Sequence, residues 1–290
     1  MNALLVEPFR EPFMERALIE LLILGVLSGV VSAFVLIRHL AFVSDALTHT
    51  VFPGIVIGYV MGSAGGVFWG ALVAGVLTAV LLTALTRTPW VTDDSALAIV
   101  LTALFSVGVV LVSRRSSFTS DLDQFLFGQV LTVDRAQIVQ TGIVAGVVLL
   151  TLAAFGKEFV LRAFDPQHAA AAGYRTGLLD LALNVLIALV VVAAARAVGT
   201  VLAIALLIVP AAVGRVISGR LSLIVCIGAV VSVLGGYLGL AVSYYASVTA
   251  DVPLASGPAV VLVLVAFYLV LFAMAAAWPR VSVLIGRTGR

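Results

Sequence analysis

Cysteine is almost absent from this sequence of 290 residues, in which Cys226 is the only thiol and lies within an apolar run. A single cysteine can form no internal disulfide, and it cannot supply the thiolate cluster of a structural zinc site. The composition therefore excludes a disulfide-stabilised secreted fold and argues against redox chemistry.

Charged residues are also scarce. They make up 10% of the chain, while 63% of the residues are hydrophobic and the mean hydropathy is +1.25; an ordinary soluble domain has roughly 25% charged residues. The 16 lysines and arginines are scattered in ones and twos, so no basic patch predicts nucleic-acid binding. Because no water-soluble fold hides this much apolar surface, we expect a polytopic membrane protein surrounded by lipid.

Motifs for nucleotide hydrolysis and for common hydrolases are missing. The nearest approach to a phosphate-binding P-loop runs from Gly214 to Gly219 and is followed by Arg220 and Leu221, so it lacks the required lysine and hydroxyl. No nucleophile elbow, His-Glu-x-x-His motif or dinucleotide fingerprint occurs. We therefore predict that the chain is not an enzyme and that it hydrolyses no nucleotide itself.

What the sequence does have is long apolar runs. A spanning helix needs about 20 mostly apolar residues, because every backbone amide in hydrocarbon must find an internal partner. The first run is too long for a signal-peptide core, so we interpret it as a retained helix. The nine candidate runs are 17–37, 41–62, 65–85, 95–113, 136–155, 178–198, 200–217, 221–245 and 258–278. Within 114–135, the segment 125–128 could be a re-entrant or interfacial piece, which leaves eight or ten spans open.

The positive charges favour one orientation, since lysine and arginine are retained preferentially in cytoplasmic loops. With nine spans, an outer amino terminus and an inner carboxyl terminus, ten of the 16 basic residues fall on the cytoplasmic side, although Arg114 and Arg115 break the pattern. The outer segments then collect acidic residues. These would either draw cations toward that face or form ordinary solvated loops.

Glycines spaced four residues apart recur within the apolar runs. This spacing lets helices approach closely in lipid, where dispersion contacts replace the hydrophobic effect as the packing force. The pairs are Gly25 and Gly29, Gly54 and Gly58, Gly62 and Gly66, and Gly235 and Gly239. We interpret them as helix-packing positions.

Among the ionisable residues inside apolar runs, we single out Glu20, Asp45 and His49. A charge at the bilayer centre costs about 2.5–3.5 kcal/mol on insertion scales, so such residues should face a partner or a water-filled cavity. Asp45 and His49 are four residues apart and share one face of a helix, with Thr48 alongside. The pair could hold one divalent cation, or it could form a structural hydrogen bond between two buried polar groups.

The donor types narrow the choice of metal. Oxygen and imidazole donors without a thiolate suit Mn²⁺, Zn²⁺ or Fe²⁺ better than Cu⁺, and two side chains alone bind weakly enough to release the ion. Glu20, near the outer end of the first run, is a candidate further ligand, a vestibule charge or a neighbour of lipid headgroups. We expect Thr48, Phe52, Pro53 and Gly54 to form a kink or gate beside the pair, although kinks also arise from packing alone.

A second candidate feature lies in the loop between the fifth and sixth runs. Asp165 can cap a helix, Pro166 suits its first position and Gly173 can end it. The short helix predicted within about 163–176 lies outside the bilayer, either as a docking element for a cytoplasmic protein or as a plain connector. Its candidate contact residues are Asp165, Pro166, Gln167, His168, Ala172, Gly173 and Tyr174.

Three stretches are distinctive. They are Ile37 to His49 with Phe-Pro-Gly at 52–54, Ala195 to Thr200 leading into Ala205 to Ala212, and Ser243-Tyr244-Tyr245 with the downstream Ser256-Gly257-Pro258. On these stretches the sequence resembles the membrane permeases of the ABC-type manganese, zinc and iron importers, the ABC-3 family, and the likeness extends over most of the chain.

This resemblance implies an all-α bundle of the type II ABC importer kind, with residues 1–290 forming a single transmembrane domain in the cytoplasmic membrane of a prokaryote. It implies assembly from a second permease copy, cytoplasmic ATP-binding subunits and an extracytoplasmic metal-binding protein. Asp45 to His49 then match the family's Asp-Ala-Leu-Ser-His pattern, a transient metal site or gate, and the 165–173 helix matches the family's coupling helix. The resemblance also implies that no cofactor is bound permanently, since the metal would be cargo and ATP would bind to the partner subunit.

Some positions depart from the family or distinguish its members. Thr48 replaces the usual serine but keeps the hydroxyl, and Pro53 resembles the manganese and iron members more than the zinc members. The loop 248–253 is longer than we expect, which bears on contacts to the binding protein.

Other functions stay open at this point. They are a secondary carrier or channel for divalent cations, an ABC permease for a metal chelate such as a siderophore or a cobalamin-like ligand, and an intramembrane enzyme. The enzyme would need a catalytic constellation facing Asp45 and His49, and the sequence offers none.

Overall fold

The computed structural model describes residues 9, 11–113, 128, 130–249 and 254–287, and the regular structure in these ranges is helical. The elements are α2 (Pro12–Ile37), α3 (Ala41–Thr50), α4 (Phe52–Thr86), α5 (Asp93–Ser113), the 3-10 turn η2 (Val130–Thr132), α7 (Arg135–Phe164), α8 (Pro166–Ala171), α9 (Thr176–Val198), α10 (Thr200–Ile217), α11 (Leu221–Thr249) and α12 (Ser256–Arg287). Nine segments in these ranges are long and apolar enough to cross a membrane, which confirms the predicted count. Residues 125–127 of the re-entrant or interfacial piece predicted at 125–128 lie outside the described residues.

The fifth span is longer than the sequence predicts. It begins at Arg135, where the side chain of Asp134 accepts a 2.6 Å hydrogen bond from the Gln137 amide and caps the helix. It continues past the apolar run, through a kink at Phe155, and ends only at Phe164. The prediction stopped at 155 because it followed hydrophobicity, whereas charged residues propagate a helix well once it leaves the lipid.

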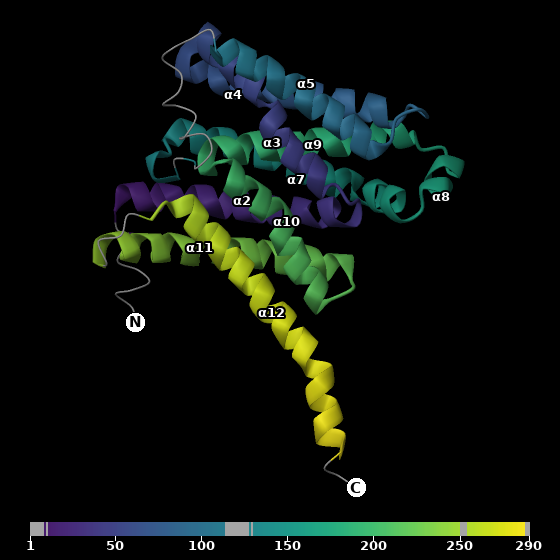
Figure 1. Cartoon of the computed structure of the whole chain (residues 1–290), viewed down its shortest axis with the longest axis vertical. Coiled ribbons are helices and arrows are strands. Elements are labelled where there is room, and N and C mark those ends of the chain that lie inside the picture. The colour runs from purple at the N-terminus through teal and green to yellow at the C-terminus, as the bar shows by residue number, and fades with distance from the viewer. Residues whose placement is uncertain (1–8, 10, 114–127, 129, 250–253, 288–290) are drawn as a thin grey trace.

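The helices form one bundle (Figure 1). α2 packs along α11 and also contacts α7 and α10, while α9 packs against α4 and α7. α5 packs on α4 at one side of the bundle, and α12 runs away from it toward the carboxyl terminus. Short α3 lies between these groups, in contact with α4, α5, α9 and α10.

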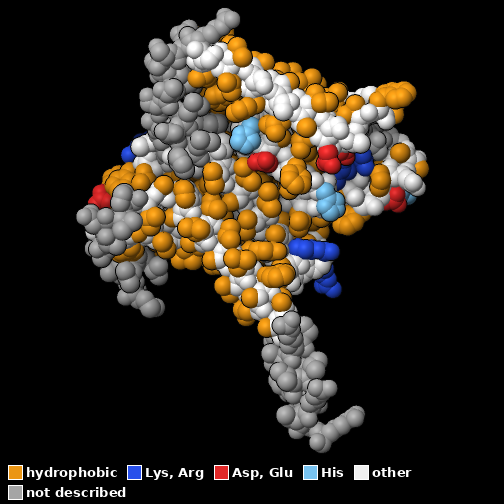
Figure 2. Space-filling view, in the orientation of Figure 1, with side chains coloured by type: hydrophobic (Ala, Val, Ile, Leu, Met, Phe, Trp, Pro, Cys, Tyr) orange, Lys and Arg blue, Asp and Glu red, His pale blue; other side chains and the backbone are white. Residues whose placement is uncertain are grey.

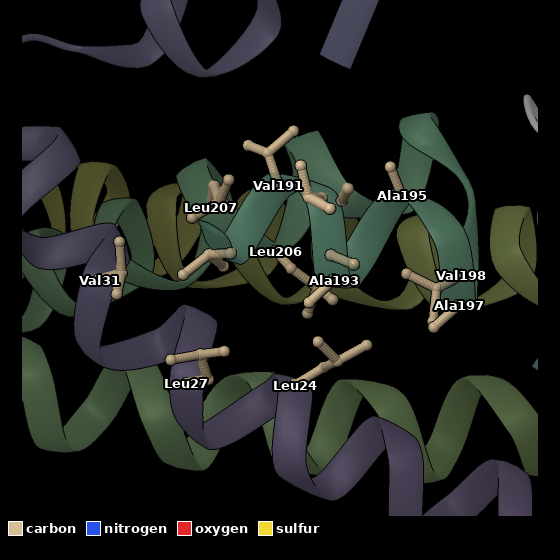
Figure 3. Close-up of a cluster of buried hydrophobic side chains, with 14 of the residues drawn as sticks. Leu24, Leu27, Val31, Val191, Ala193, Ala195, Ala197, Val198, Leu206 and Leu207 are labelled. Atoms are coloured by element: carbon tan, nitrogen blue, oxygen red, sulfur yellow. The ribbon is translucent and has the colours of Figure 1, made fainter. Parts of the chain in front are cut away.

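The core is built from aliphatic side chains of α2, α9 and α10. Figure 3 shows Leu24, Leu27 and Val31 of α2 pointing toward the small and branched side chains of α9, with Leu206 of α10 beside them. The four named side chains of α2 and α10 are at most 1% exposed. The helices around α3 therefore form a closely packed frame.

Close glycine contacts fold α4 back on itself between the spans Ala41–Gly62 and Gly65–Thr86. A Cβ added at Gly54 would collide with the carbonyl oxygen of Gly70, and one added at Gly58 would collide with that of Gly66. Gly29 likewise lies against the backbone of Ala229 in α11. The packing role predicted for the glycine pairs is thus confirmed at these positions, but a Cβ added at Gly62 would meet no atom of another part of the described chain within 4 Å.

Candidate functional site

Helix α3 carries the predicted polar pair. It follows α2 after a tight turn at Arg38 to Leu40, in which His39 adopts a left-handed backbone with φ of 54°. Ser44, Leu47 and Thr48 are completely buried on one side of α3. The neighbouring helices therefore fix the rotation of α3 and leave the Asp45 and His49 side chains on its more open side.

The two side chains come close without forming a hydrogen bond. His49 Nε2 lies 3.9 Å from Asp45 Oδ1, and the side chains are 40% and 47% exposed, respectively. A separation of 3.9 Å is too long for a hydrogen bond. The geometry therefore shows no structural hydrogen bond between Asp45 and His49. The carboxylate oxygens and the imidazole nitrogen are not bonded to each other and can coordinate another ligand.

Aromatic rings flank the histidine. Phe105 of α5 meets the His49 ring edge to face at a centroid distance of 6.1 Å, and it lies 6.0 Å from the ring of Phe52. Phe52 is buried against α5, where its ring occupies the space beside Gly108. The sequence alone did not single out Phe105, because nothing in an apolar run shows which of its faces meets α3.

Thr48 does not share the open side with Asp45 and His49. Its side chain is fully buried, and its hydroxyl donates a 2.6 Å hydrogen bond to the carbonyl oxygen of Asp45. This bond lies within the turn that carries both residues of the pair. Thr48 therefore ties the backbone of that turn and has no hydroxyl directed at a ligand.

The predicted break beyond the pair lies between Thr50 and Phe52. α3 ends at Thr50 and α4 begins at Phe52, with Val51 as a helical joint that bonds to Leu47 on one side and Ile55 on the other. Pro53 has no N–H, so it cannot donate to the carbonyl of His49 four residues earlier. The helix is interrupted at this point, although Val51 itself keeps helical backbone angles, with φ of −75° and ψ of −15°.

Glu20 lies in a different polar cluster. Its side chain is fully buried in α2, where Oε1 accepts a 2.6 Å hydrogen bond from Thr141 Oγ1 of α7. Nearby, Arg196 of α9 donates a 2.5 Å hydrogen bond to Gln140 and stacks over the ring of Phe68.

Within the described residues, no group of three or more acidic, histidine or cysteine side chains could hold a metal ion. Asp45 and His49 thus stand as a pair of protein donors.

Helix α8 forms where the capping residues predict it. Asp165 Oδ1 accepts a 2.8 Å hydrogen bond from the His168 amide, and Pro166 occupies the first position. At the other end Gly173 has φ of 87°, with its amide bonded to the Ala170 carbonyl and the Tyr174 amide bonded to the Ala169 carbonyl. This pair of bonds is the Schellman motif, which closes a helix through a left-handed glycine.

The surface of α8 is open. Ala169 is buried, whereas Asp165, Pro166, Gln167, His168, Ala172, Gly173 and Tyr174 are exposed. Figure 2 shows that charged and histidine side chains are few on the visible face of the molecule and are surrounded by hydrophobic ones. The capped helix α8, which exposes Gln167 and His168 between the two spans Arg135–Phe164 and Thr176–Val198, is thus a distinct feature of this surface.

A helical bundle whose described part has nine membrane-length segments, with a polar pair inside one of them, defines a polytopic membrane transport protein. The chain belongs to the ABC 3 transport family, whose family profile matches residues 10–275. It is a multi-pass membrane permease subunit of an ABC transporter, and it is not the subunit that hydrolyses ATP.

Named relatives cover nearly the whole chain. The manganese transport system membrane protein MntC of Listeria monocytogenes is 35% identical over 263 residues, which is 91% of each chain. The chelated iron transport system membrane protein YfeD of Yersinia pestis is 32% identical and covers 92% of this chain and 87% of its own. The solved structure of PsaBC from Streptococcus pneumoniae in complex with Fab matches with a TM-score of 0.80 and 29% identity, covering 94% of this chain and 95% of that one.

Proposed function

We propose that this chain is the permease subunit of an ATP-driven importer of divalent metal ions, with Asp45 and His49 as the transient metal ligands. The observation that carries the proposal is the arrangement of these two side chains. They lie one turn apart on a short helix in the middle of the bundle, with both donor groups accessible and not bonded to each other.

The distance between the donor atoms suits a shared cation. Two ligands at about 2.1 Å from a metal, at angles between octahedral and tetrahedral, lie roughly 3.0–3.4 Å apart. The observed 3.9 Å becomes such a separation after a small rotation of either side chain. Two protein ligands leave most positions of an octahedral ion to water, so the ion can be released again.

Manganese is the metal we place first, with iron and zinc as alternatives. The carboxylate oxygen and imidazole nitrogen form a donor set that suits all three ions. The names of the relatives favour manganese, as in MntC of Listeria monocytogenes and in the manganese import system permease protein ScaB of Streptococcus gordonii, which is 31% identical. The name of the Yersinia pestis relative supports iron as the next candidate.

The permease would work with partners. We infer a second permease copy, a cytoplasmic ATP-binding subunit docked on α8, and an extracytoplasmic metal-binding protein. The exposed, doubly capped α8 supports the docking role, because a rigid six-residue helix with one buried residue offers most of its surface to another protein.

Reconstitution in liposomes tests this proposal. The permease alone should accumulate no manganese when ATP is supplied, and accumulation should begin when the ATP-binding subunit and the metal-loaded binding protein are added. Uptake by the permease alone, driven by a proton or metal gradient, would show instead that the chain is a secondary carrier or channel. Elemental analysis of cells that lack or overproduce the transporter would identify the metal.

A further inference from the structure

An ion cluster joins the three helices that lead to α3 and α8. Asp180 of α9 accepts from two arginines, with Oδ1 at 2.6 Å from Arg38 Nη2 and Oδ2 at 2.8 Å from Arg162 Nη2. Arg38 also donates to the main-chain carbonyl of Arg162 at 3.2 Å. The three side chains are between 17% and 21% exposed, so solvent screens their attraction only in part.

The cluster lies where the chain enters α3 and where the loop with α8 begins and ends. Arg162 lies two residues before the end of α7, and Asp180 lies in the second turn of α9, so their ion pair closes the loop that carries α8. Arg38 directly follows α2 and opens the turn to α3. The Asp180 carboxylate therefore contacts two segments at once. Through Arg162 it binds the end of α7, which leads into α8, and through Arg38 it binds the turn that leads into α3, the helix with Asp45 and His49.

The connection from Arg38 to the metal pair is short. Only the turn at His39 and Leu40 separates Arg38 from Ala41, the first residue of α3, and Asp45 lies one turn further along. His39 holds an uncommon left-handed backbone for a residue other than glycine. A displacement of Arg38 would thus be passed to a rigid short helix through a turn that has little freedom of its own.

Two buried atoms in and beside the cluster make no hydrogen bond. Among the described residues, Arg162 Nε and Glu158 Oε2 are buried atoms without a hydrogen-bond partner. Glu158 precedes Arg162 by four residues on α7, the spacing at which a glutamate and an arginine on one helix attract each other. Arg162 therefore has an alternative partner one turn away if its bond to Asp180 opens.

We propose that Asp180 is a positioning residue that couples movement of α8 to the orientation of the metal-bearing helix α3. The inference rests on the proposed function, in which α8 receives the ATP-driven movement. When the docked subunit displaces α8, the Arg162–Asp180 pair opens or shifts, and the Arg38–Asp180 pair moves with it. The turn at His39 then transfers the change to Asp45 and His49.

The first test measures transport and ATP hydrolysis together, in proteoliposomes that contain the permease, the ATP-binding subunit and the metal-binding protein. Asp180→Asn keeps the size of the side chain and removes its charge. Manganese moved per ATP hydrolysed should fall about 2- to 30-fold, the range found for residues that carry coupling between sites. Asp180→Glu should recover part of the ratio, and Asp94→Asn, an exposed aspartate at the start of α5, should leave it at the wild-type value.

A merely structural role for Asp180 would give a different result. Loss of folded complex lowers transport and hydrolysis by the same factor and leaves their ratio unchanged. An unchanged ratio in Asp180→Asn would therefore overturn the inference.

A second readout does not depend on transport. Phe42 lies on α3 and is 73% exposed, so a Phe42→Cys variant in a Cys226→Ser background reports the surroundings of α3 through its rate of maleimide labelling. The rate should change when a non-hydrolysable ATP analogue is added, and Asp180→Asn should abolish that change. Two results would contradict the coupling. The labelling rate of the Phe42→Cys, Cys226→Ser protein could stay the same when the analogue is added, or the rate could change equally when Asp180→Asn is also present. If the wild-type complex moves no manganese, the proposed function fails, and this labelling still decides the role of Asp180.

Discussion

Thr141 on α7 donates a 2.6 Å hydrogen bond from Oγ1 to Oε1 of Glu20 on α2, and the Glu20 side chain is completely buried there. The other carboxylate oxygen, Oε2, is also buried and has no hydrogen-bond partner in the described part of the chain. Among the described residues, the Thr141 hydroxyl is thus the one hydrogen-bond donor to this carboxylate. The contact joins two helices that frame the bundle, far apart in the sequence.

Removing this hydroxyl should destabilise the protein. Thr141→Val keeps the shape of the side chain but leaves the Glu20 carboxylate without its donor, which should lower the free energy of unfolding by about 1–3 kcal/mol. Thermal unfolding in detergent measures the effect. Thr151→Val is the matched control, because the Thr151 hydroxyl bonds only to the Val147 carbonyl of its own helix, and an equal loss in both variants would contradict the prediction.

The glycine hairpin of α4 gives a second prediction. Gly58→Ala adds a methyl group where the backbone of Gly66 leaves no room, so the two arms must separate, at a cost of about 1–3 kcal/mol in the free energy of unfolding. Gly62→Ala is the control on the same arm, since a Cβ there meets nothing within 4 Å. Equal melting temperatures for the two variants would show that the close approach of Gly58 and Gly66 carries no energetic weight.

The end of α8 gives a third prediction. Gly173 has φ of 87°, a conformation that costs a branched side chain about 1–2 kcal/mol but that asparagine tolerates. Gly173→Val should therefore loosen the last turn of α8 and raise ATP hydrolysis that is not accompanied by manganese uptake, while Gly173→Asn should behave like the wild type. The assay is ATPase activity with and without metal-loaded binding protein.

Manganese binding provides the check on this third prediction. It should be unchanged in Gly173→Val, because α8 lies apart from the Asp45 and His49 pair. A variant that lost manganese binding and kept its coupling would reverse the roles proposed for the two features.

Local sequence signals were sufficient for much of the fold. Nine apolar runs predicted nine spans, and the Asp165, Pro166 and Gly173 signals predicted α8, because spanning length and capping depend on nearby residues alone. The four-residue spacing of Asp45 and His49 likewise predicted a shared helix face. These features need no knowledge of tertiary packing.

Contacts between residues far apart in the chain could not be predicted from the sequence. Asp180 lies 142 residues from Arg38, and nothing local to either residue indicates that they meet. Phe105 could not be assigned to His49 for the same reason. Thr48 looked like a partner of the pair by its spacing, but its rotation is set by the helices that bury it.

The central claim is that Asp45 and His49 hold the transported metal, and manganese uptake by the fully assembled complex tests it most directly. Asp45→Ala and His49→Ala should each abolish uptake, while assembly with the ATP-binding subunit persists and the control Asp94→Ala transports at the wild-type rate. Wild-type uptake in both Asp45→Ala and His49→Ala would contradict the account.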